Sequence, residues 1–216
     1  MEQVKEIPIL FNGEMVQAIL DGRKTQTRRP VKQIIDKRTT EIKWNSAYEA
    51  FVPWSNLVSH SGAGFFRTGE PMQSPFGKPG DILWVRETFR KTNCKHWMVV
   101  QEGDCFAYRA GGDYFCGSND PHLCDDAVTW TPSIHMPKSA CRIKLKVNRV
   151  WVERVQDIDS LDATKEGIVW DPGVRWTHYD EKRSNAYVSL FSDLWDSIYG
   201  TWDDNVWVWC CEFEVI

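Results

Sequence analysis

The strictest pattern in the chain is the alternation of CRIKLKV, Cys141–Val147, where the odd positions are apolar or cysteine and the even positions are cationic. Successive side chains of a β-strand point to opposite faces of a sheet, so this run predicts a half-buried strand. The alternation falters at Asn148 and resumes with Val150 and Val152, which is consistent with a β-bulge or a bend. A strand of this kind requires a sheet that packs one face on an apolar core.

Several other segments predict strands and helices. Further strands are expected at Ile7–Phe11, Asp81–Phe89 and Asn205–Ile216. Apolar residues recur at helical spacing in three segments: Glu14–Asp21, Leu161–Glu166 and Tyr187–Ile198. A glycine that can end the helix follows each of them: Gly22, Gly167 and Gly200. In the last strand the adjacent Cys210 and Cys211 point to opposite faces and are interpreted as packing residues.

Two long stretches show no sustained period. Residues 31 to about 77 and 91 to about 139 are interpreted as irregular insertions, which in a compact domain are usually functional or mobile. The strands outnumber the helices, and long connections separate them. We therefore expect an α+β protein whose single domain spans residues 1–216, built as a small mixed β-barrel with helices at its ends.

Composition limits the classes of function. The 216 residues carry a net charge of −4, which argues against coating duplex DNA, while the basic segment Asp21–Lys32 leaves room for a local pocket that takes a nucleotide or a flipped base. No run reaches the ~20 apolar residues that a membrane helix needs, and the first residues do not resemble a signal peptide. We expect a soluble cytoplasmic protein without membrane contact.

The seven cysteines favour reduced thiols over disulfides. Four of them lie in the second insertion, near two histidines: Cys94, Cys105, Cys116 and Cys124, with His96 and His122. These residues could bind zinc and order the insertion. Against this, no Cys-x-x-Cys pair occurs and the spacings are long, so partly buried thiols are the alternative, and no cofactor is expected.

The segment DGRKTQTRRP, Asp21–Pro30, follows the first expected helix and combines four cations with two threonines. A threonine hydroxyl becomes a nucleophile when a neighbour takes its proton, and a lysine can do so if burial and adjacent cations lower its pKa. Lys24 and Thr27 could act in this way, as the base and the nucleophile. The alternative is structural, since cations after a helix neutralise its C-terminal dipole and threonine is common in turns.

The order of these motifs resembles the ASCH domain, which has a PUA-like β-barrel fold. The resemblance rests on GRKTQTRR, GDILWV, CRIKLKV, DSLDATKEGI, FSDLWDSIYG and VWVWCCEFEV, and covers roughly half of the chain. It implies a relationship to small bacterial N4-acetylcytidine amidohydrolases, whose catalytic lysine, threonine and glutamate fall on Lys24, Thr27 and Glu166, and whose arginine falls on Arg29. This chain is much larger than those enzymes and looks most like the ASCH proteins of bacteriophage and prophage genomes, which would place it in a host cytoplasm.

Other residues suit a pocket for a base. Substrate binding is assigned to cationic, aromatic and polar side chains of three segments: Arg28, Arg29, Trp84, Arg86, Glu87, His135 and Lys138. An aromatic face and polar edges are what such a pocket uses, and Lys138 could contact a phosphate. Core packing is the alternative for Trp84, and a hydrogen-bonded structural role is the alternative for His135.

Three functions follow from these observations. The first is hydrolysis of an N4-acylated cytidine or a related modified base by Lys24, Thr27 and Glu166. The second is non-catalytic binding of a modified nucleotide or of single-stranded or modified RNA in the same pocket. The third is a phage accessory or counter-defence role, in which the insertions bind a host protein.

Overall fold

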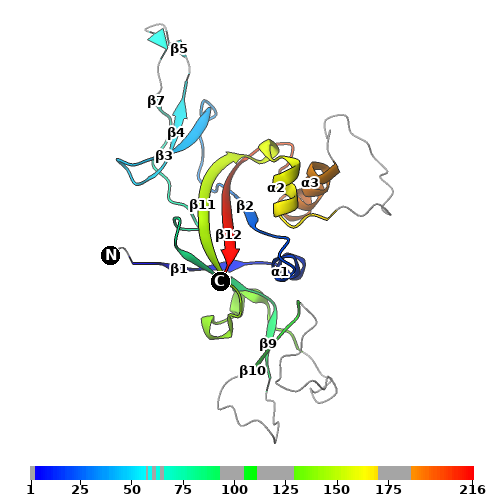
Figure 1. Cartoon of the computed structure of the whole chain (residues 1–216). Helices are drawn as coiled ribbons and strands as arrows, with labels where there is room; N and C mark the ends of the chain where they lie inside the picture. Colours follow the sequence, from blue (N-terminus) through cyan, green and yellow to red (C-terminus); the bar gives the residue numbers. More distant parts are fainter. Residues whose placement is uncertain are drawn as a thin grey trace, which may run out of the picture.

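The computed structural model describes residues 3–56, 58–59, 62–63, 66–92, 105–110, 129–169 and 186–216. In these residues the protein is a mixed α+β structure, mostly sheet, with three α-helices. Figure 1 shows the helices gathered beside one end of a curved central sheet. No helix in the described ranges has the length and apolar character to cross a membrane.

The central sheet has five strands in the order β1-β8-β11-β12-β2 (Figure 1). Their bounds are β1 Glu6–Leu10, β8 Ile82–Arg86, β11 Lys144–Arg154, β12 Trp207–Val215 and β2 Gln26–Pro30. β1 and β8 pair in parallel, and the other neighbours are antiparallel. The strands expected at the start, the centre and the end of the chain are thus confirmed, and they all belong to one sheet.

The bulge expected at Asn148 is confirmed. The register between β11 and β12 shifts between Val147 and Arg149, so Asn148 is the extra residue. Val147 lies in the main core before the shift, and Val150 packs against that core after it. The apolar residues of this 11-residue strand thus face the same core on both sides of the bulge, although the extra residue shifts the alternation by one position.

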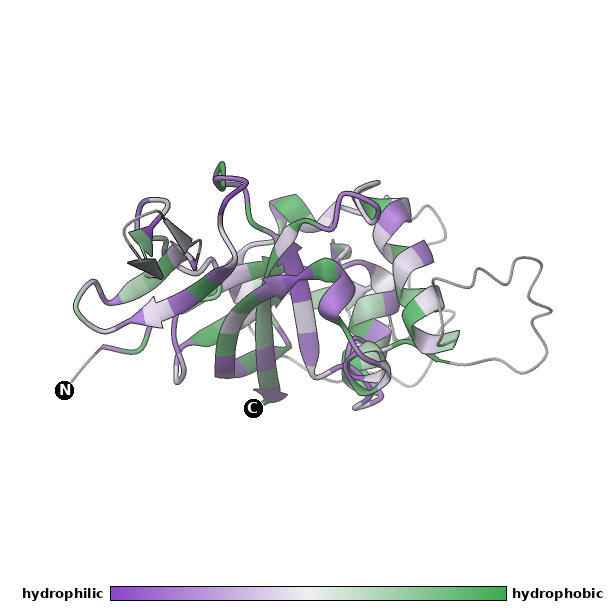
Figure 2. Ribbon diagram, turned by 90° about the horizontal axis from the view of Figure 1, so that it is seen from above, coloured by the Kyte–Doolittle hydropathy of each residue, from purple (hydrophilic) through white to green (hydrophobic). Residues whose placement is uncertain are grey.

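Strand β12 is buried on both faces. Trp209, Cys211 and Phe213 belong to the main core, whereas Val208 and Cys210 belong to a second core. The second core includes Ala163 of α2 and Phe191 and Trp195 of α3. Cys210 and Cys211 thus point to opposite faces as expected, and β12 is the wall that the helices and the main core share. Figure 2 shows hydrophobic and hydrophilic bands alternating along the strands of the sheet.

The three helices lie where the sequence predicts them. They are α1 Gly13–Leu20, α2 Ser160–Lys165 and α3 Ala186–Ile198. The Asn12 side chain caps α1 by accepting from Met15 N, and the Asp159 side chain caps α2 by accepting from Asp162 N. Gly22 has a φ of 72° just after α1, a backbone conformation that glycine adopts without strain.

The expectation that residues 31–77 are irregular is wrong for much of this stretch. Strands β3 Glu41–Asn45, β4 Ala50–Ser55 and β7 Phe66–Arg67 form a small sheet that extends away from the central one (Figure 1), and β5 Val58–Ser59 pairs with β6 Gly62–Ala63. Four consecutive residues of β4 are buried, so β4 lacks the alternation by which a strand is recognised. The Phe51 ring lies 5.0 Å from the Trp209 ring and joins this sheet to the main core.

The second insertion also has regular structure in its described part. Strand β9 Phe89–Thr92 pairs antiparallel with β10 Cys105–Tyr108. Short 3₁₀ turns occur at Ser133–His135 and Lys138–Ala140, and a third, Val155–Asp157, follows β11. The described residues of the second insertion are thus partly regular, and the prediction of an irregular insertion is wrong for them.

Candidate active site

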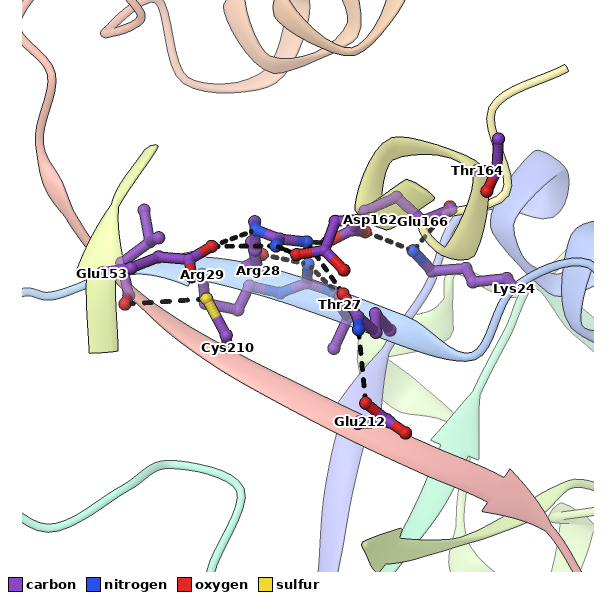
Figure 3. Close-up of polar contacts among 12 residues, drawn as sticks. Lys24, Thr27, Arg28, Arg29, Glu153, Asp162, Thr164, Glu166, Cys210 and Glu212 are labelled. Carbon is purple, nitrogen blue, oxygen red and sulfur yellow. Dashed lines mark hydrogen bonds and ion pairs between the residues drawn. The ribbon is translucent and has the colours of Figure 1, made fainter. Parts of the chain in front are cut away.

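Lys24 and Glu166 meet in the interior. Lys24 follows α1, and Glu166 is the residue that ends α2. The Lys24 ammonium lies 2.6 Å from Glu166 Oε2 and also donates to the Glu166 carbonyl oxygen at 2.8 Å (Figure 3). Only 1% of Lys24 and 6% of Glu166 is exposed, so this is a buried ion pair. The two residues that the sequence assigns as base and carboxylate are therefore in contact.

The local backbone explains why these residues converge. Thr25 N donates to the Lys165 carbonyl oxygen at 2.8 Å, which holds the chain after α1 against the end of α2. Gly167 has a φ of 94°, and a Cβ there would lie 2.8 Å from the Ala18 Cβ and 3.3 Å from the Lys24 Cβ. The glycine after Glu166 thus permits both the turn and the close approach of the two segments.

The environment lowers the pKa of Lys24. Burial is the main cause, because it disfavours the charged ammonium, and the charges of Arg29 and Arg28 act in the same direction. Glu166 opposes them as a charge and as a hydrogen-bond acceptor. A lysine with a lowered pKa has a larger fraction of neutral amine at a given pH, and the neutral amine is the form that can accept a proton.

Arg28 is held by three carboxylates from two other elements. Its guanidinium lies 2.8 Å from Glu153 of β11, 2.8 Å from Asp162 of α2 and 3.1 Å from Glu166. Arg28 Nη1 also donates to Gln26 Oε1 at 3.2 Å, and only 2% of Arg28 is exposed. Although burial disfavours its charge, the pKa of Arg28 is raised by Cys210, Glu166 and Glu153. The side chain expected to bind substrate is thus bound within the protein (Figure 3).

Thr27 and Arg29 lie on the opposite face of β2 from Arg28. Thr27 pairs with Cys211 of β12, which belongs to the main core, and no part of Thr27 is exposed. Arg29 Nη1 donates to Thr27 Oγ1 at 3.0 Å, and Arg29 Nη2 donates to the Leu10 carbonyl oxygen at 3.0 Å, which joins the two edge strands of the sheet. The hydrogen bonds of the described residues include none between Lys24 and Thr27. The Thr27 hydroxyl instead accepts from Arg29.

One aromatic ring contacts both cations of this region. The Lys24 ammonium lies 5.7 Å from the centre of the Phe11 ring, and the Arg29 guanidinium lies 5.4 Å from it. Phe11 is 3% exposed and belongs to the main core. Lys24 and Arg29 thus both lie against the Phe11 ring, and Arg29 is the residue that donates to the Thr27 hydroxyl.

Two cavities lie against α1, and Asn12 and Glu14 belong to the walls of both. The larger is about 830 Å³, and it is lined by Leu10, Phe11, Asn12, Gly13, Glu14, Gln17, Glu87, Thr88, Arg109, Ala110 and Ser133. The smaller is about 270 Å³, and its wall includes Glu166 and Gly167. The larger volume suits a ligand of nucleoside size, since small-molecule sites span ~300–1,000 Å³. Phe11 is the residue that lines this cavity and contacts Lys24.

Four other predicted binding residues are not brought to Lys24. Leu83 and Val85 are buried in the main core, and Trp84 and Arg86 alternate with them on the other face of β8. Arg86 stacks on Trp84 with its guanidinium 5.5 Å from the ring centre, and it donates to the Ile134 carbonyl oxygen. The remaining two, His135 and Lys138, are exposed, and Lys138 pairs with Glu6 at 2.7 Å.

Glu87 has a structural partner. Its carboxylate accepts from Arg142 Nε at 2.8 Å and from Arg142 Nη2 at 2.9 Å, a bidentate pair. Glu87 is 1% exposed, and Arg142 also donates to the Ala110 carbonyl oxygen and lies over the Tyr108 ring. Glu87 lines the larger cavity, but its carboxylate is occupied by Arg142.

Most of the candidate zinc site lies outside the described residues. Cys94, Cys116 and Cys124 fall in those segments, as do His96 and His122, and Cys105 is described only as part of β10. Within the part of the chain that the structure describes, no three His, Cys, Asp or Glu side chains form a metal-binding group. The zinc site thus stays a prediction.

Two of the carboxylates around Arg28, Asp162 and Glu153, were not predicted from the sequence. Asp162 and Glu166 are four residues apart, so they share one face at the end of α2, which was a readable signal. Glu153 follows Trp151 by two positions in β11, and the Trp151 indole donates to Glu153 Oε2 at 2.6 Å. Nothing in the local sequence connects Glu153 with Arg28, because their proximity arises only from the order of the strands.

Comparisons with protein-family models, with curated proteins and with solved structures give no match.

Proposed function

We propose that the chain is an ASCH protein with a PUA-like barrel and that it hydrolyses the amide of an N4-acylated cytidine or of a related modified base. The observation that carries the proposal is the buried contact between Lys24 and Glu166, two of the three positions that the family resemblance assigns to catalysis. An ion pair formed only for stability would be poorly placed here, because desolvation offsets much of the attraction between buried charges.

Lys24 is suited to act as the general base. A neutral amine has two N–H groups and one lone pair, and two of the positions around Lys24 Nζ are taken by the Glu166 carboxylate and carbonyl oxygens. The lone pair is then free to accept a proton. Arg29 donates to the Thr27 oxygen, which leaves the hydroxyl proton of Thr27 free to be donated.

The proposed reaction has two stages. Lys24 Nζ takes the hydroxyl proton as Thr27 Oγ1 attacks the acyl carbon, and the bond from that carbon to the exocyclic nitrogen of cytosine then breaks. The leaving nitrogen takes the proton from Lys24, and the acyl group remains on Thr27 as an ester. Water hydrolyses the ester, which releases a carboxylic acid and returns the proton to Thr27 Oγ1. Glu166 orients Lys24 throughout.

The substrate would enter from the larger cavity. Phe11 lies between that cavity and Lys24, and Arg29 reaches the surface beside Leu10. Because Thr27 is fully buried, the reaction requires Phe11 or Arg29 to move when substrate binds. Local movements of this kind are common steps in enzyme turnover.

A second candidate is a non-catalytic binding module for a modified nucleotide or RNA. The observation in its favour is that the Thr27 hydroxyl accepts from Arg29 and has no hydrogen bond to Lys24 among the described residues. In this function Lys24 and Glu166 would serve to hold the end of α2, and Arg29 would contact the ligand.

Purified protein incubated with N4-acetylcytidine separates the two functions. Hydrolysis predicts that cytidine and acetate appear in equal amounts and that Lys24→Met lowers the rate by ~10²–10⁴-fold, the usual contribution of a general base. The binding function predicts no cytidine, together with ligand binding that persists in Thr27→Ala and weakens in Arg29→Ala. Absence of both cytidine and binding contradicts both candidates.

A further inference from the structure

We propose that Arg28 is a positioning residue, which holds the Glu166 carboxylate in the orientation that Lys24 needs. The proposal rests on the proposed function, but its main measurement does not require turnover. It changes the role expected of Arg28 from the sequence, which was to contact the substrate.

The geometry of Arg28 carries the inference. Glu166 uses its two carboxylate oxygens for two different cations: Oε2 lies 2.6 Å from Lys24 Nζ, and Oε1 lies 3.1 Å from Arg28 Nη1. Rotation of the carboxylate would break both contacts. Arg28 itself cannot turn, because Glu153 and Asp162 each lie 2.8 Å from Nη2. Arg28 thus fixes Glu166, and Glu166 fixes Lys24.

Only a guanidinium can make these contacts together. Arg28 Nε also donates to Glu153 at 2.9 Å, and Nη1 also donates to Gln26 at 3.2 Å, so all three nitrogens are used. A lysine ammonium is a single centre on a flexible stem and cannot reach β11, α2 and the Glu166 carboxylate at once. An Arg28→Lys variant would therefore keep the charge and lose the fixed geometry.

Arg28 also acts on the charge of Lys24. The charged groups that face Lys24 are Glu166 at the end of α2 and Arg28 and Arg29 of β2. The positive charge of Arg28 lowers the pKa of Lys24. Loss of Arg28 removes this charge, so the pKa of Lys24 should rise.

The first test measures the pKa of Lys24 directly. The ¹³Cε chemical shift of Lys24 is followed against pH by NMR of lysine-labelled protein, in wild type, Arg28→Gln, Arg28→Lys and Arg149→Gln. Arg149 is the matched control, because it is an arginine of β11 that stacks on Trp151. We expect a higher titration midpoint of Lys24 in Arg28→Gln, a smaller increase in Arg28→Lys and the wild-type midpoint in Arg149→Gln.

The second test uses hydrolysis of N4-acetylcytidine. Because Arg28 is buried and occupied, we expect both Arg28 variants to lower kcat about tenfold or more with little change in KM. A raised KM with unchanged kcat would overturn the proposal, because it would mean that Arg28 binds substrate. An unchanged titration midpoint of Lys24 in Arg28→Gln would also overturn it. If wild type does not hydrolyse N4-acetylcytidine, and the midpoint of Lys24 still rises in Arg28→Gln, the proposed function fails and the positioning role stands.

Discussion

Lys24 Nζ and Glu166 Oε2 lie 2.6 Å apart in the interior of the protein, although 142 residues separate them in the chain. The contact joins the segment after α1 to the end of α2. An isolated antiparallel β-bridge also pairs the backbones of the same two residues. Burial of two opposite charges is costly, and their attraction offsets this cost only where the geometry is good and further hydrogen bonds satisfy the remaining atoms. Here Arg28 extends the pair into a network of five charged side chains.

Gly167→Ala tests the close approach that forms the site. The new Cβ would lie 2.8 Å from the Ala18 Cβ at a φ of 94°, so we expect a loss of about 1–3 kcal/mol in the free energy of unfolding. Gly13→Ala is the control, because a Cβ there meets nothing within 4 Å. Urea unfolding of both variants measures the difference. Equal stability of the two would mean that α2 does not pack on Lys24 as described.

The Glu87–Arg142 pair should be structural. Glu87→Gln leaves the Arg142 guanidinium with a neutral partner in a largely buried site, so we expect a loss of ~3–5 kcal/mol in the free energy of unfolding. The matched change Glu214→Gln removes the exposed pair with Lys146 and should cost ~0–1 kcal/mol. Thermal and urea unfolding check both values. A cost for Glu87→Gln as small as that for Glu214→Gln would refute the buried pair.

Lys24 should make stability depend on pH. Its pKa is lowered in the folded state from 10.5, so between the lowered value and 10.5 the unfolded chain binds more protons than the folded chain. The contribution of Lys24 to the free energy of unfolding therefore rises with pH across that window. Below the window Lys24 is charged in the folded state as well, and the full cost of burying that charge applies. Lys24→Met should remove this slope, which a series of urea unfolding curves at increasing pH would reveal. Parallel pH profiles for the two proteins would exclude a lowered pKa.

Four strands of the central sheet could be predicted from the sequence, whereas its fifth strand, β2, and the small sheet could not. CRIKLKV alternates because one face of β11 meets the core and the other meets solvent, and the interruption at Asn148 marks a real bulge. Strand β4 carries no such signal, since its residues are buried on both faces. Strand β2 was also hidden, because its cations and threonines read as a connecting segment while its partner β12 lies at the far end of the chain.

The candidate site could be predicted only in part, and mainly through the family resemblance. The residue types around Lys24 suggest chemistry, but no local pattern pairs Lys24 with Glu166 at such a separation. That Trp84 and Arg86 share one face of β8 followed from the strand alternation, but the alternation does not say which elements this face meets. Arg28 shows the same limit, because its three carboxylates come from β11 and from the end of α2.

Hydrolysis of N4-acetylcytidine by variants of two threonines in the same segment distinguishes the proposed nucleophile from its neighbour. Thr27 offers the proposed nucleophile, whereas Thr25 uses its backbone N–H and carbonyl groups to join Lys165 and Phe213. We predict that wild type and Thr25→Ala release cytidine at similar rates and that Thr27→Ala is slower by at least ~10²-fold. Release of cytidine by Thr27→Ala at the wild-type rate would exclude Thr27 as the nucleophile, and no release by wild type would exclude hydrolysis of this substrate.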